Sequence, residues 1–384
     1  MKIAILTQPL HTNYGGILQA YALQTFLQKY GNEVLVVNRD YDNKISLKLI
    51  LLRIGSVIKC FIRLVLFGQK EYILMNPFSP FYHNKWSGYD ILPFVKKKIN
   101  QTKEIRSTRK LRKYFKHNKF DVYIIGSDQV WRPCYSPCIT DFFLKEVPSD
   151  SDAIKIAYAA SFGTDKWEFS YEETEECASL AKLFNAVSVR EESGVKLCEQ
   201  YLGVCAEHLL DPTMLLEKED YTELFNKARI PKRKENLFCY ILDYNSEADQ
   251  IISSLREDGY VPNIVSLYTN STKESIRPCQ LSVEEWLRGV YDSEMVVTDS
   301  FHACVFSIIF NKPFIVVGNK NRGNSRFDSL LNMFGIQNRM IETFDKFKSG
   351  YEFLKDSGDI INANILLNAY RQKSISFLET NKVL

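Results

Sequence analysis

The chain opens with a short apolar run, an amphipathic stretch and a second apolar run, and this order constrains the fold more than any other feature. Lys2 to Leu6 is the first run, and Glu33 to Asn38 is the second. Between them, Leu23 and Leu27 lie on one face of a helical pattern. A strand, a helix and a strand in this order form a βαβ unit, whose two strands are parallel. The opening of the chain therefore predicts a parallel sheet covered by helices.

The same alternation continues through most of the remaining sequence. The expected strands are 122–125, 154–159, 186–189, 237–242, 263–268, 295–298 and 313–317, and the expected helices are 172–184, 191–202, 247–257, 283–291, a short one from about Ser300, and 327–334. The pattern restarts after Asp211-Pro212-Thr213, and 384 residues are enough for two domains. We therefore expect an α/β protein with two Rossmann-like domains, 1–212 and 213–384, the second ending in a terminal helix.

Residues 44–100 do not follow the alternation and indicate a helical insertion in the first domain. Within it, 45–67 is apolar, and Lys48, Arg53, Lys59 and Arg63 fall on one side of a helical wheel. Four basic residues argue against a helix that spans a bilayer. The pattern fits either an interfacial helix on anionic lipid or an ordinary helix packed against the sheet.

Composition excludes some classes of function. The chain has 49 basic and 46 acidic side chains, so its net charge of +3 gives no global field for a nucleic-acid partner. Its nine cysteines are scattered singly, which is typical of a reducing compartment and predicts a cytoplasmic protein. Cys134 and Cys138 have no neighbouring Cys or His pair to complete a zinc site, so no metal is expected.

Ligands of parallel α/β sheets collect at the carboxyl ends of the strands, so the turns there are the candidate sites. The first turn contains Asn13, Gly15 and Gly16, where paired glycines allow backbone N–H groups to approach a bound group. The spacing is neither a dinucleotide fingerprint nor a P-loop. A plain tight turn is the competing interpretation.

The segment after 122–125 brings together a carboxylate, an amide and an indole, namely Asp128, Gln129 and Trp131. This set suits a sugar, because hydroxyl groups pair with the polar side chains and the sugar ring stacks on Trp. Equally, Ser127 or Asp128 could cap a helix while Trp131 packs in the core.

Two further turns carry groups that bind anions. Arg190 follows the strand 186–189 and can pair with a carboxylate or phosphate, although Glu191 or Glu192 could claim it instead. Ser300 and His302 lie in the first turn of the helix after 295–298. There the free N–H groups, the helix dipole and the imidazole would favour a bound anion and supply a proton donor. A capped helix with a hydrogen-bonded histidine is the alternative.

A Gly/Asn loop beyond the last strand holds Lys320, Arg322 and Arg326. It could close over a donor as a cationic lid, or it could be an ordinary solvated loop.

The candidate turns belong to a series of short motifs along the chain, namely Asn13-Tyr-Gly-Gly-Ile-Leu-Gln-Ala-Tyr-Ala-Leu-Gln24, Gly126-Ser-Asp-Gln-Val-Trp131, Tyr158-Ala-Ala-Ser-Phe-Gly163, Ser188-Val-Arg-Glu-Glu-Ser-Gly194, Leu210-Asp-Pro-Thr213, Thr298-Asp-Ser-Phe-His302 and Asn324-Ser-Arg326. Taken together, these motifs resemble those of the bacterial polysaccharide pyruvyl transferase family. The resemblance implies a glycosyltransferase-B-like fold with two domains facing across a cleft. It also implies phosphoenolpyruvate as donor, no cofactor, and a pyruvate ketal on a saccharide in cell-surface polysaccharide biosynthesis.

The resemblance leads to a hypothesis for the site. His302 is the expected acid and Asp128 the expected base. The donor phosphate would meet His302 and Ser300, and its carboxylate Arg190 or Arg326. Further donor-binding candidates are Gly15, Gly16, Asn324 and Ser325, and the acceptor-binding candidates are Asn13, Gln129 and Trp131. Ser300 stands where some relatives have an arginine.

Two other classes of function remain open. One is a glycosyltransferase that uses a nucleotide-sugar in the same cleft, and the other is a saccharide-binding protein without catalysis. The acceptor could be lipid-linked or free, and a lipid-linked acceptor would bring the protein to the inner face of the membrane.

Overall fold

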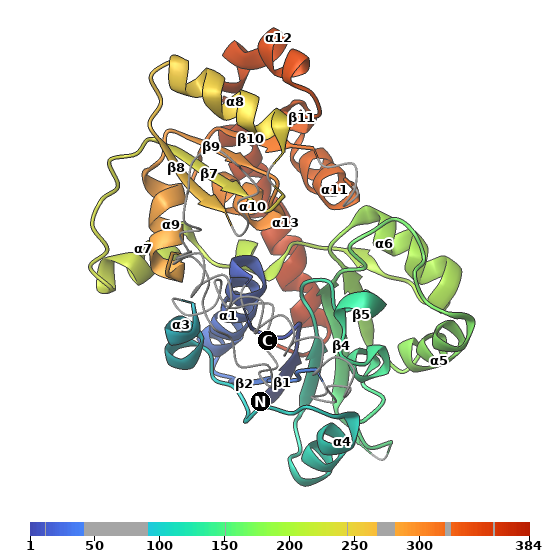
Figure 1. Cartoon of the computed structure of the whole chain (residues 1–384). Coiled ribbons are helices and arrows are strands. Elements are labelled where there is room, and N and C mark those ends of the chain that lie inside the picture. The colour runs from blue at the N-terminus through green and yellow to red at the C-terminus, as the bar shows by residue number, and fades with distance from the viewer. Residues whose placement is uncertain are drawn as a thin grey trace, which may run out of the picture.

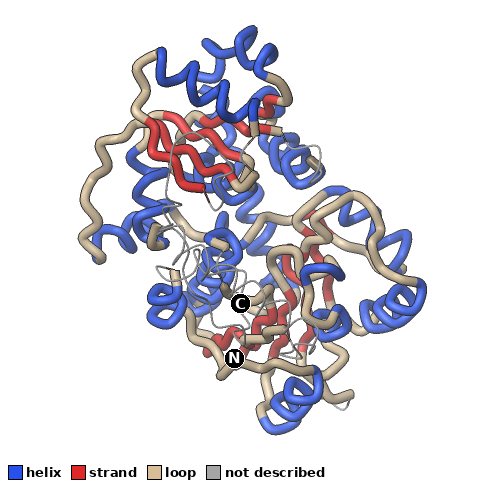
Figure 2. Tube along the Cα trace, in the orientation of Figure 1, coloured by secondary structure: helices blue, strands red, loops and turns tan. Residues whose placement is uncertain are grey.

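The computed structural model describes residues 1–11, 13–41, 91–149, 151–243, 245–266, 281–318, 324–355 and 358–384. These residues form two parallel sheets with helices packed against them (Figure 1; Figure 2). The predicted α/β fold with two Rossmann-like halves is confirmed. The pattern at 45–67, with Lys48, Arg53, Lys59 and Arg63, lies outside the described residues, as does most of the expected insertion.

The first sheet has six strands in the order β2-β1-β3-β4-β5-β6, and all neighbouring pairs are parallel. Its strands are β1 Lys2–Leu6, β2 Glu33–Val37, β3 Val122–Ile125, β4 Ile154–Ala160, β5 Ala186–Val189 and β6 Glu207–His208. Ile3 of the central strand β1 pairs with Val34 on one side and Val122 on the other. Apolar runs form these strands because helices cover both faces of the sheet and leave no strand face in water.

The described helices of this half number five, and Asn13, Ser107 and Ser170 cap three of them. They are α1 Tyr14–Lys29, α3 Leu92–Lys98, α4 Thr108–His117, α5 Tyr171–Ala181 and α6 Glu192–Leu197, which continues as a π-turn over Cys198–Leu202. Asn13 caps α1 by accepting from Gly15 N at 3.0 Å. Such a cap satisfies an N–H group that the helix itself leaves unpaired.

The second sheet has the order β11-β10-β9-β7-β8 and is parallel throughout its described strands. Its strands are β7 Leu237–Ile241, β8 Pro262–Ser266, β9 Met295–Thr298, β10 Phe314–Val317 and β11 Met340–Ile341. The accompanying helices are α7 Lys218–Lys227, α8 Ser246–Glu257, α9 Val283–Asp292, α10 Phe301–Ile309, α11 Ser325–Phe334 and α12 Phe344–Lys355. The capping box predicted at Ser282 is present, with Glu285 as its partner.

The terminal helix α13, Gly358–Thr380, packs against both halves (Figure 1). Near its start, Asn364 donates to the carbonyl of Ile308 in the second half at 3.0 Å. Near its end, the Phe377 ring lies 6.3 Å from the ring of Tyr158 in the first half. The helix that the sequence assigns to the second domain therefore ties the two halves together.

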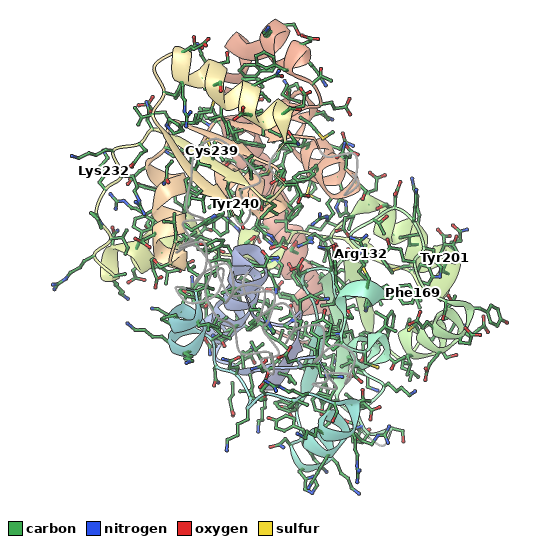
Figure 3. The ribbon with its side chains drawn as sticks, in the orientation of Figure 1. Arg132, Phe169, Tyr201, Lys232, Cys239 and Tyr240 are labelled. Atoms are coloured by element: carbon green, nitrogen blue, oxygen red, sulfur yellow. The ribbon has the colours of Figure 1, made fainter. Side chains whose placement is uncertain are left out.

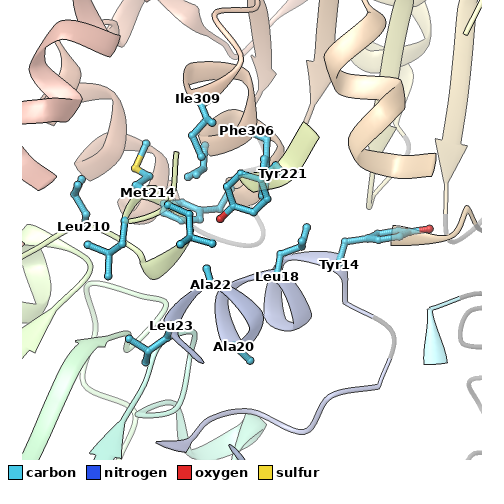
Figure 4. Close-up of a cluster of buried hydrophobic side chains, with 14 of the residues drawn as sticks. Tyr14, Leu18, Ala20, Ala22, Leu23, Leu210, Met214, Tyr221, Phe306 and Ile309 are labelled. Atoms are coloured by element: carbon cyan, nitrogen blue, oxygen red, sulfur yellow. The ribbon is translucent and has the colours of Figure 1, made fainter. Parts of the chain in front are cut away.

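One apolar core is shared between the halves (Figure 4). Leu18 and Ala22 of α1 lie in the same buried cluster as Met214, Phe306 and Ile309. Burial of a side chain the size of Leu or Phe stabilises a fold by about 2 kcal/mol. This shared core holds the start of α1 close to α10, which positions the site described next.

Among the described residues, no helix is both long and apolar enough to cross a bilayer.

Candidate functional site

Turns at the carboxyl ends of strands from both sheets meet where the halves touch. The β1–α1, β3 and β5–α6 turns belong to the first sheet, and the β9–α10 turn belongs to the second. Arg190, directly after β5, places its guanidinium 4.4 Å from the centre of the Phe301 ring at the start of α10. A cation over an aromatic face is an attractive contact. The turns identified in the sequence therefore lie in one region.

A carboxylate that the sequence did not identify lies at the centre of this region. Asp211 Oδ2 accepts from Arg190 Nη1 at 2.8 Å and lies 3.4 Å from His302 Nε2. Ser127 Oγ lies 3.3 Å from the same oxygen, while Asp211 Oδ1 accepts from the backbone and hydroxyl of Thr213 at 3.0 and 2.7 Å. Asp211 thus joins groups from three separate segments.

The charges of this cluster stabilise one another. Burial by itself would raise the pKa of Asp211, but His302 and Arg190 outweigh burial and hold that pKa far below its usual range. Burial likewise opposes the charge on Arg190, yet Asp211, Asp128 and Glu191 raise the pKa of the guanidinium above its ordinary value. Both groups therefore stay ionised, with almost no contact with solvent.

The position of His302 depends on a glycine in the opposite half. A Cβ atom on Gly15 would lie only 1.9 Å from His302 Nδ1, so only glycine allows the imidazole to occupy this place. The other ring nitrogen faces Asp211. His302 is the second residue of α10 and is 5% exposed. One edge of the ring thus faces the β1–α1 turn and the other faces a carboxylate.

The β9–α10 turn is rigidly held by its own side chains. Asp299 accepts from the backbone N–H groups of Leu242 and Asp243 at 2.6 and 2.8 Å. Ser300 N donates to Thr298 Oγ1 at 3.0 Å, and the Ser300 hydroxyl makes no capping hydrogen bond to α10. The helix begins at Phe301, one residue later than predicted, and no side chain of the described residues caps its first N–H groups.

Asp128 lies beside the same cluster. Its Oδ1 is 3.4 Å from Arg190 Nη2, and its Oδ2 would be 3.2 Å from a Cβ atom on Gly16. The residue has a φ of 67°, in the left-handed region that residues other than glycine seldom adopt. The predicted base therefore lies near the start of α1 and close to the predicted acid.

A second polar group lies where α11 begins, opposite α6. Glu192 N donates to Ser329 Oγ of α11 at 2.8 Å, which joins the two helices across the halves. Five buried polar atoms here have no hydrogen-bond partner among the described residues, namely Glu191 Oε2, Ser193 Oγ, Asn324 Oδ1, Ser325 Oγ and Arg326 Nε. Buried polar atoms in native proteins are almost always paired, so a group of unpaired ones is typical of a binding site for a polar ligand.

In this second group, burial shifts the pKa of both Arg326 and Glu191 toward the neutral form. Burial lowers the pKa of Arg326, and the positive charge of Arg190 lowers it further. Burial raises the pKa of Glu191, although Arg190 and Ser161 oppose that rise. An anion bound beside Arg326 would relieve the repulsion between the two guanidinium groups.

The stacking role predicted for Trp131 is wrong. Its side chain is 0% exposed, its Nε1 donates to the Phe142 carbonyl at 3.0 Å, and its ring is stacked on Phe143 at 4.9 Å. An indole that is covered on its faces by protein cannot stack on a sugar. The alternative interpretation of this residue, packing in the core, is the one that the structure shows.

Other candidates have local structural contacts. Gln129 Oε1 accepts from Arg132 Nη1 at 3.2 Å, and Asn13 is occupied as the cap of α1. Lys320 and Arg322 of the expected lid lie outside the described residues. In the part of the chain that the structure describes, no group of three His, Cys, Asp or Glu side chains could hold a metal ion.

The chain resembles a known protein family in sequence and solved structures in fold. A family model described as polysaccharide pyruvyl transferase matches residues 13–321. No curated protein matches the chain by sequence. A UDP-N-acetylglucosamine 2-epimerase structure from Rickettsia bellii is 8% identical with a TM-score of 0.51, covering 100% of this chain and 97% of that one. A structure described as the same enzyme from Listeria monocytogenes is 9% identical with a TM-score of 0.51, covering 99% and 97%. At such identities the likeness concerns the fold alone.

Proposed function

Since the chain belongs to the polysaccharide pyruvyl transferase family, we propose that it transfers pyruvate from phosphoenolpyruvate to a saccharide as a ketal. The observation that carries this proposal is the arrangement of His302 and Arg190 on the single carboxylate of Asp211, next to the free N-terminus of α10. Such a group combines a proton donor with an anion site, and phosphoenolpyruvate requires both.

The donor has two anionic ends, and the site offers two places for them. In our proposal the phosphate lies at the α10 N-terminus against Ser300 and His302. Gly16 supplies a backbone N–H group from the other half, because the N–H group of Gly15 already donates to Asn13. Arg190 is already paired with Asp211, so Arg326 is the better candidate for the donor carboxylate. Asn324 and Ser325 bring unpaired polar atoms to the same end.

The chemistry balances with the residues present. His302 protonates the methylene carbon of phosphoenolpyruvate, so C2 becomes electrophilic and a sugar hydroxyl adds to it. Asp128 accepts the proton of that hydroxyl. Phosphate then leaves C2 and takes up the proton held by Asp128, while a neighbouring hydroxyl of the same sugar closes the ketal and returns its proton to His302. Asp211 Oδ2 lies 3.4 Å from His302 Nε2 and orients the ring that gives the proton.

Burial of the acid implies that the halves separate to admit the donor. His302, Ser300 and Arg190 are all buried. Arg190 follows a strand of the first sheet, whereas Ser300 and His302 follow a strand of the second. We infer that the described arrangement is the closed form, in which water is kept from the protonated intermediate. Opening would separate the β1–α1 turn from the β9–α10 turn.

The test is incubation with phosphoenolpyruvate labelled in its pyruvyl carbons, together with nucleotide-linked, lipid-linked and free saccharides. Mass spectrometry should find a saccharide that carries labelled pyruvate, with one phosphate released for each ketal. Release of a nucleotide from a nucleotide-sugar, without use of phosphoenolpyruvate, would instead identify a glycosyltransferase. Saccharide binding with neither release would identify a binding protein.

A further inference from the structure

Positive charge is concentrated in one short part of the chain. Residues 91–120 contain 11 Lys and Arg residues and a single acidic residue, Glu104, whereas the whole chain has a net charge of only +3. The rest of the chain is therefore net acidic. A molecule with this distribution is electrically polar even though its total charge is small.

Six of these eleven residues lie on helix α4 or just beyond it. Ser107 caps the helix by accepting from Lys110 N at 3.3 Å, and Leu111 and Phe115 are buried against the first sheet. The opposite side of the helix and the residue just beyond it carry exposed basic side chains, namely Arg109, Lys110, Arg112, Lys113, Lys116 and Lys119. The helix is amphipathic, and its outer side is entirely cationic or polar.

Among the described residues, only one of these six cations has an acidic partner. Arg112 pairs with Glu146. For Arg109, Lys110, Lys113, Lys116 and Lys119, the described part of the chain contains no acidic side chain within ion-pair distance. Helix α4 lies at the end of the first half, away from α10 and α11, and nitrogen-tipped side chains project outward there (Figure 1; Figure 3). The five unpaired cations face solvent together.

We propose that this α4 surface, formed by Arg109, Lys110, Lys113, Lys116 and Lys119, docks the protein on an anionic lipid bilayer. Clusters of four to eight Lys and Arg residues on an amphipathic helix bind anionic headgroups, and each cation contributes separately near the surface. The net acidic remainder of the molecule is repelled by the same bilayer. Attraction at one end and repulsion elsewhere fix a single orientation, with α4 toward the lipid.

A bilayer suits this surface better than a nucleic acid. The cations project from a single convex helix, and the two aromatic residues among them, Tyr114 and Phe115, are half-buried and buried. Single-stranded nucleic acids require exposed aromatic rings on which bases stack, together with a basic groove. A planar layer of phosphate headgroups needs neither. None of the residues of the candidate site lies on α4, so docking leaves that site uncovered.

The experiment is co-sedimentation of the full-length protein with vesicles of phosphatidylcholine alone or mixed with phosphatidylglycerol. The wild-type protein should bind only the anionic vesicles, and added salt should weaken binding. The triple variant K110E/K113E/K116E should lower the partition coefficient roughly a hundred-fold. The control triple K166E/K232E/K234E changes the net charge equally at exposed lysines elsewhere and should bind almost as well as wild type.

Two further measurements separate this proposal from the proposed reaction. Circular dichroism should show that both triple variants fold, and transfer to a water-soluble acceptor should be the same in both. Equal loss of vesicle binding in the two triples would overturn the docking surface, as would absence of wild-type binding. Binding to double-stranded DNA in place of anionic vesicles would also overturn it. None of these outcomes depends on which donor the enzyme uses.

Discussion

Asp211 Oδ2 lies 3.4 Å from His302 Nε2 and 2.8 Å from Arg190 Nη1, so one buried carboxylate joins a histidine of the second half to an arginine of the first. Asp211 itself lies in the connection between the two sheets. Any movement of one half relative to the other must therefore act on this contact. The same contact orients the imidazole.

Replacing Asp211 by Asn should destabilise the protein because Arg190 and His302 would lose their shared counter-charge. Removal of one partner from a buried ion pair costs about 3–5 kcal/mol. Urea unfolding should show a loss of this size, whereas Glu223→Gln, which breaks the exposed pair with Lys227, should cost less than about 1 kcal/mol. Equal stability of the two variants would mean that the buried charge of Asp211 does not stabilise the folded protein.

Replacing Gly15 by Ala should remove activity without unfolding the chain. The new Cβ would lie 1.9 Å from His302 Nδ1 and must displace the ring, and a displacement of about 1 Å can cost a hundred-fold in rate. Alanine is a better helix former than glycine by about 1 kcal/mol, so α1 itself should not suffer. Gly350→Ala, also within a helix but with nothing within 4 Å, is the matched control and should keep full activity.

Replacing Arg326 by Lys should weaken donor binding more than turnover. Lysine keeps the charge but loses the bidentate geometry that suits a carboxylate. We expect the KM for phosphoenolpyruvate to rise about ten-fold or more, with a smaller change in kcat. Arg256→Lys, at an exposed position of α8, should leave both constants as they are. An unchanged KM in the Arg326 variant would remove this residue from the donor site.

The stability of a Glu191→Gln variant should depend on pH in a defined direction. Burial raises the pKa of Glu191 in the folded state, so folding favours its protonated form. That contribution is complete below the unfolded pKa, near 4.3, and is lost as the pH rises through the raised folded value.

Glutamine does not ionise, so the variant should gain stability relative to wild type as the pH increases from about 4.5 to 8. The gain is about 1.4 kcal/mol for every pH unit by which the folded pKa exceeds the unfolded one. Thermal unfolding of both proteins across this range measures it. A difference in stability that stays constant, or that falls as the pH rises, would show that folding does not raise the pKa of Glu191.

Much of the fold could be predicted because the buried strands are apolar runs of the right length. The run 122–125 is β3 without change, and the helix predicted at 283–291 differs from α9 by one residue. Edge strands β6 and β11 have two residues each, which is too short to give a pattern. The path of α13 across both halves depends on distant contacts that local periodicity does not record.

The site was less predictable, for a physical reason. Gly15 and His302 could be proposed because their residue types suit turns at strand ends. Trp131 could not be judged locally, because an indole that stacks on a sugar and one that stacks on Phe143 have the same sequence. In the sequence, Asp211 appeared only in the motif Leu210-Asp-Pro-Thr213 and at the boundary between the two domains, without a role in the site. The available signal was an aspartate before a proline at the point where the second half begins, and only tertiary contacts show which charges it meets.

The central claim is that His302 protonates the methylene carbon of phosphoenolpyruvate and so makes C2 electrophilic. The most direct measurement follows phosphate release and ketal formation together, for wild type and for His302→Asn, with circular dichroism to show that the variant folds. The account predicts equal amounts of phosphate and ketal from the wild-type protein and neither from the variant. A folded His302→Asn protein that forms the ketal at near-normal rate would contradict it.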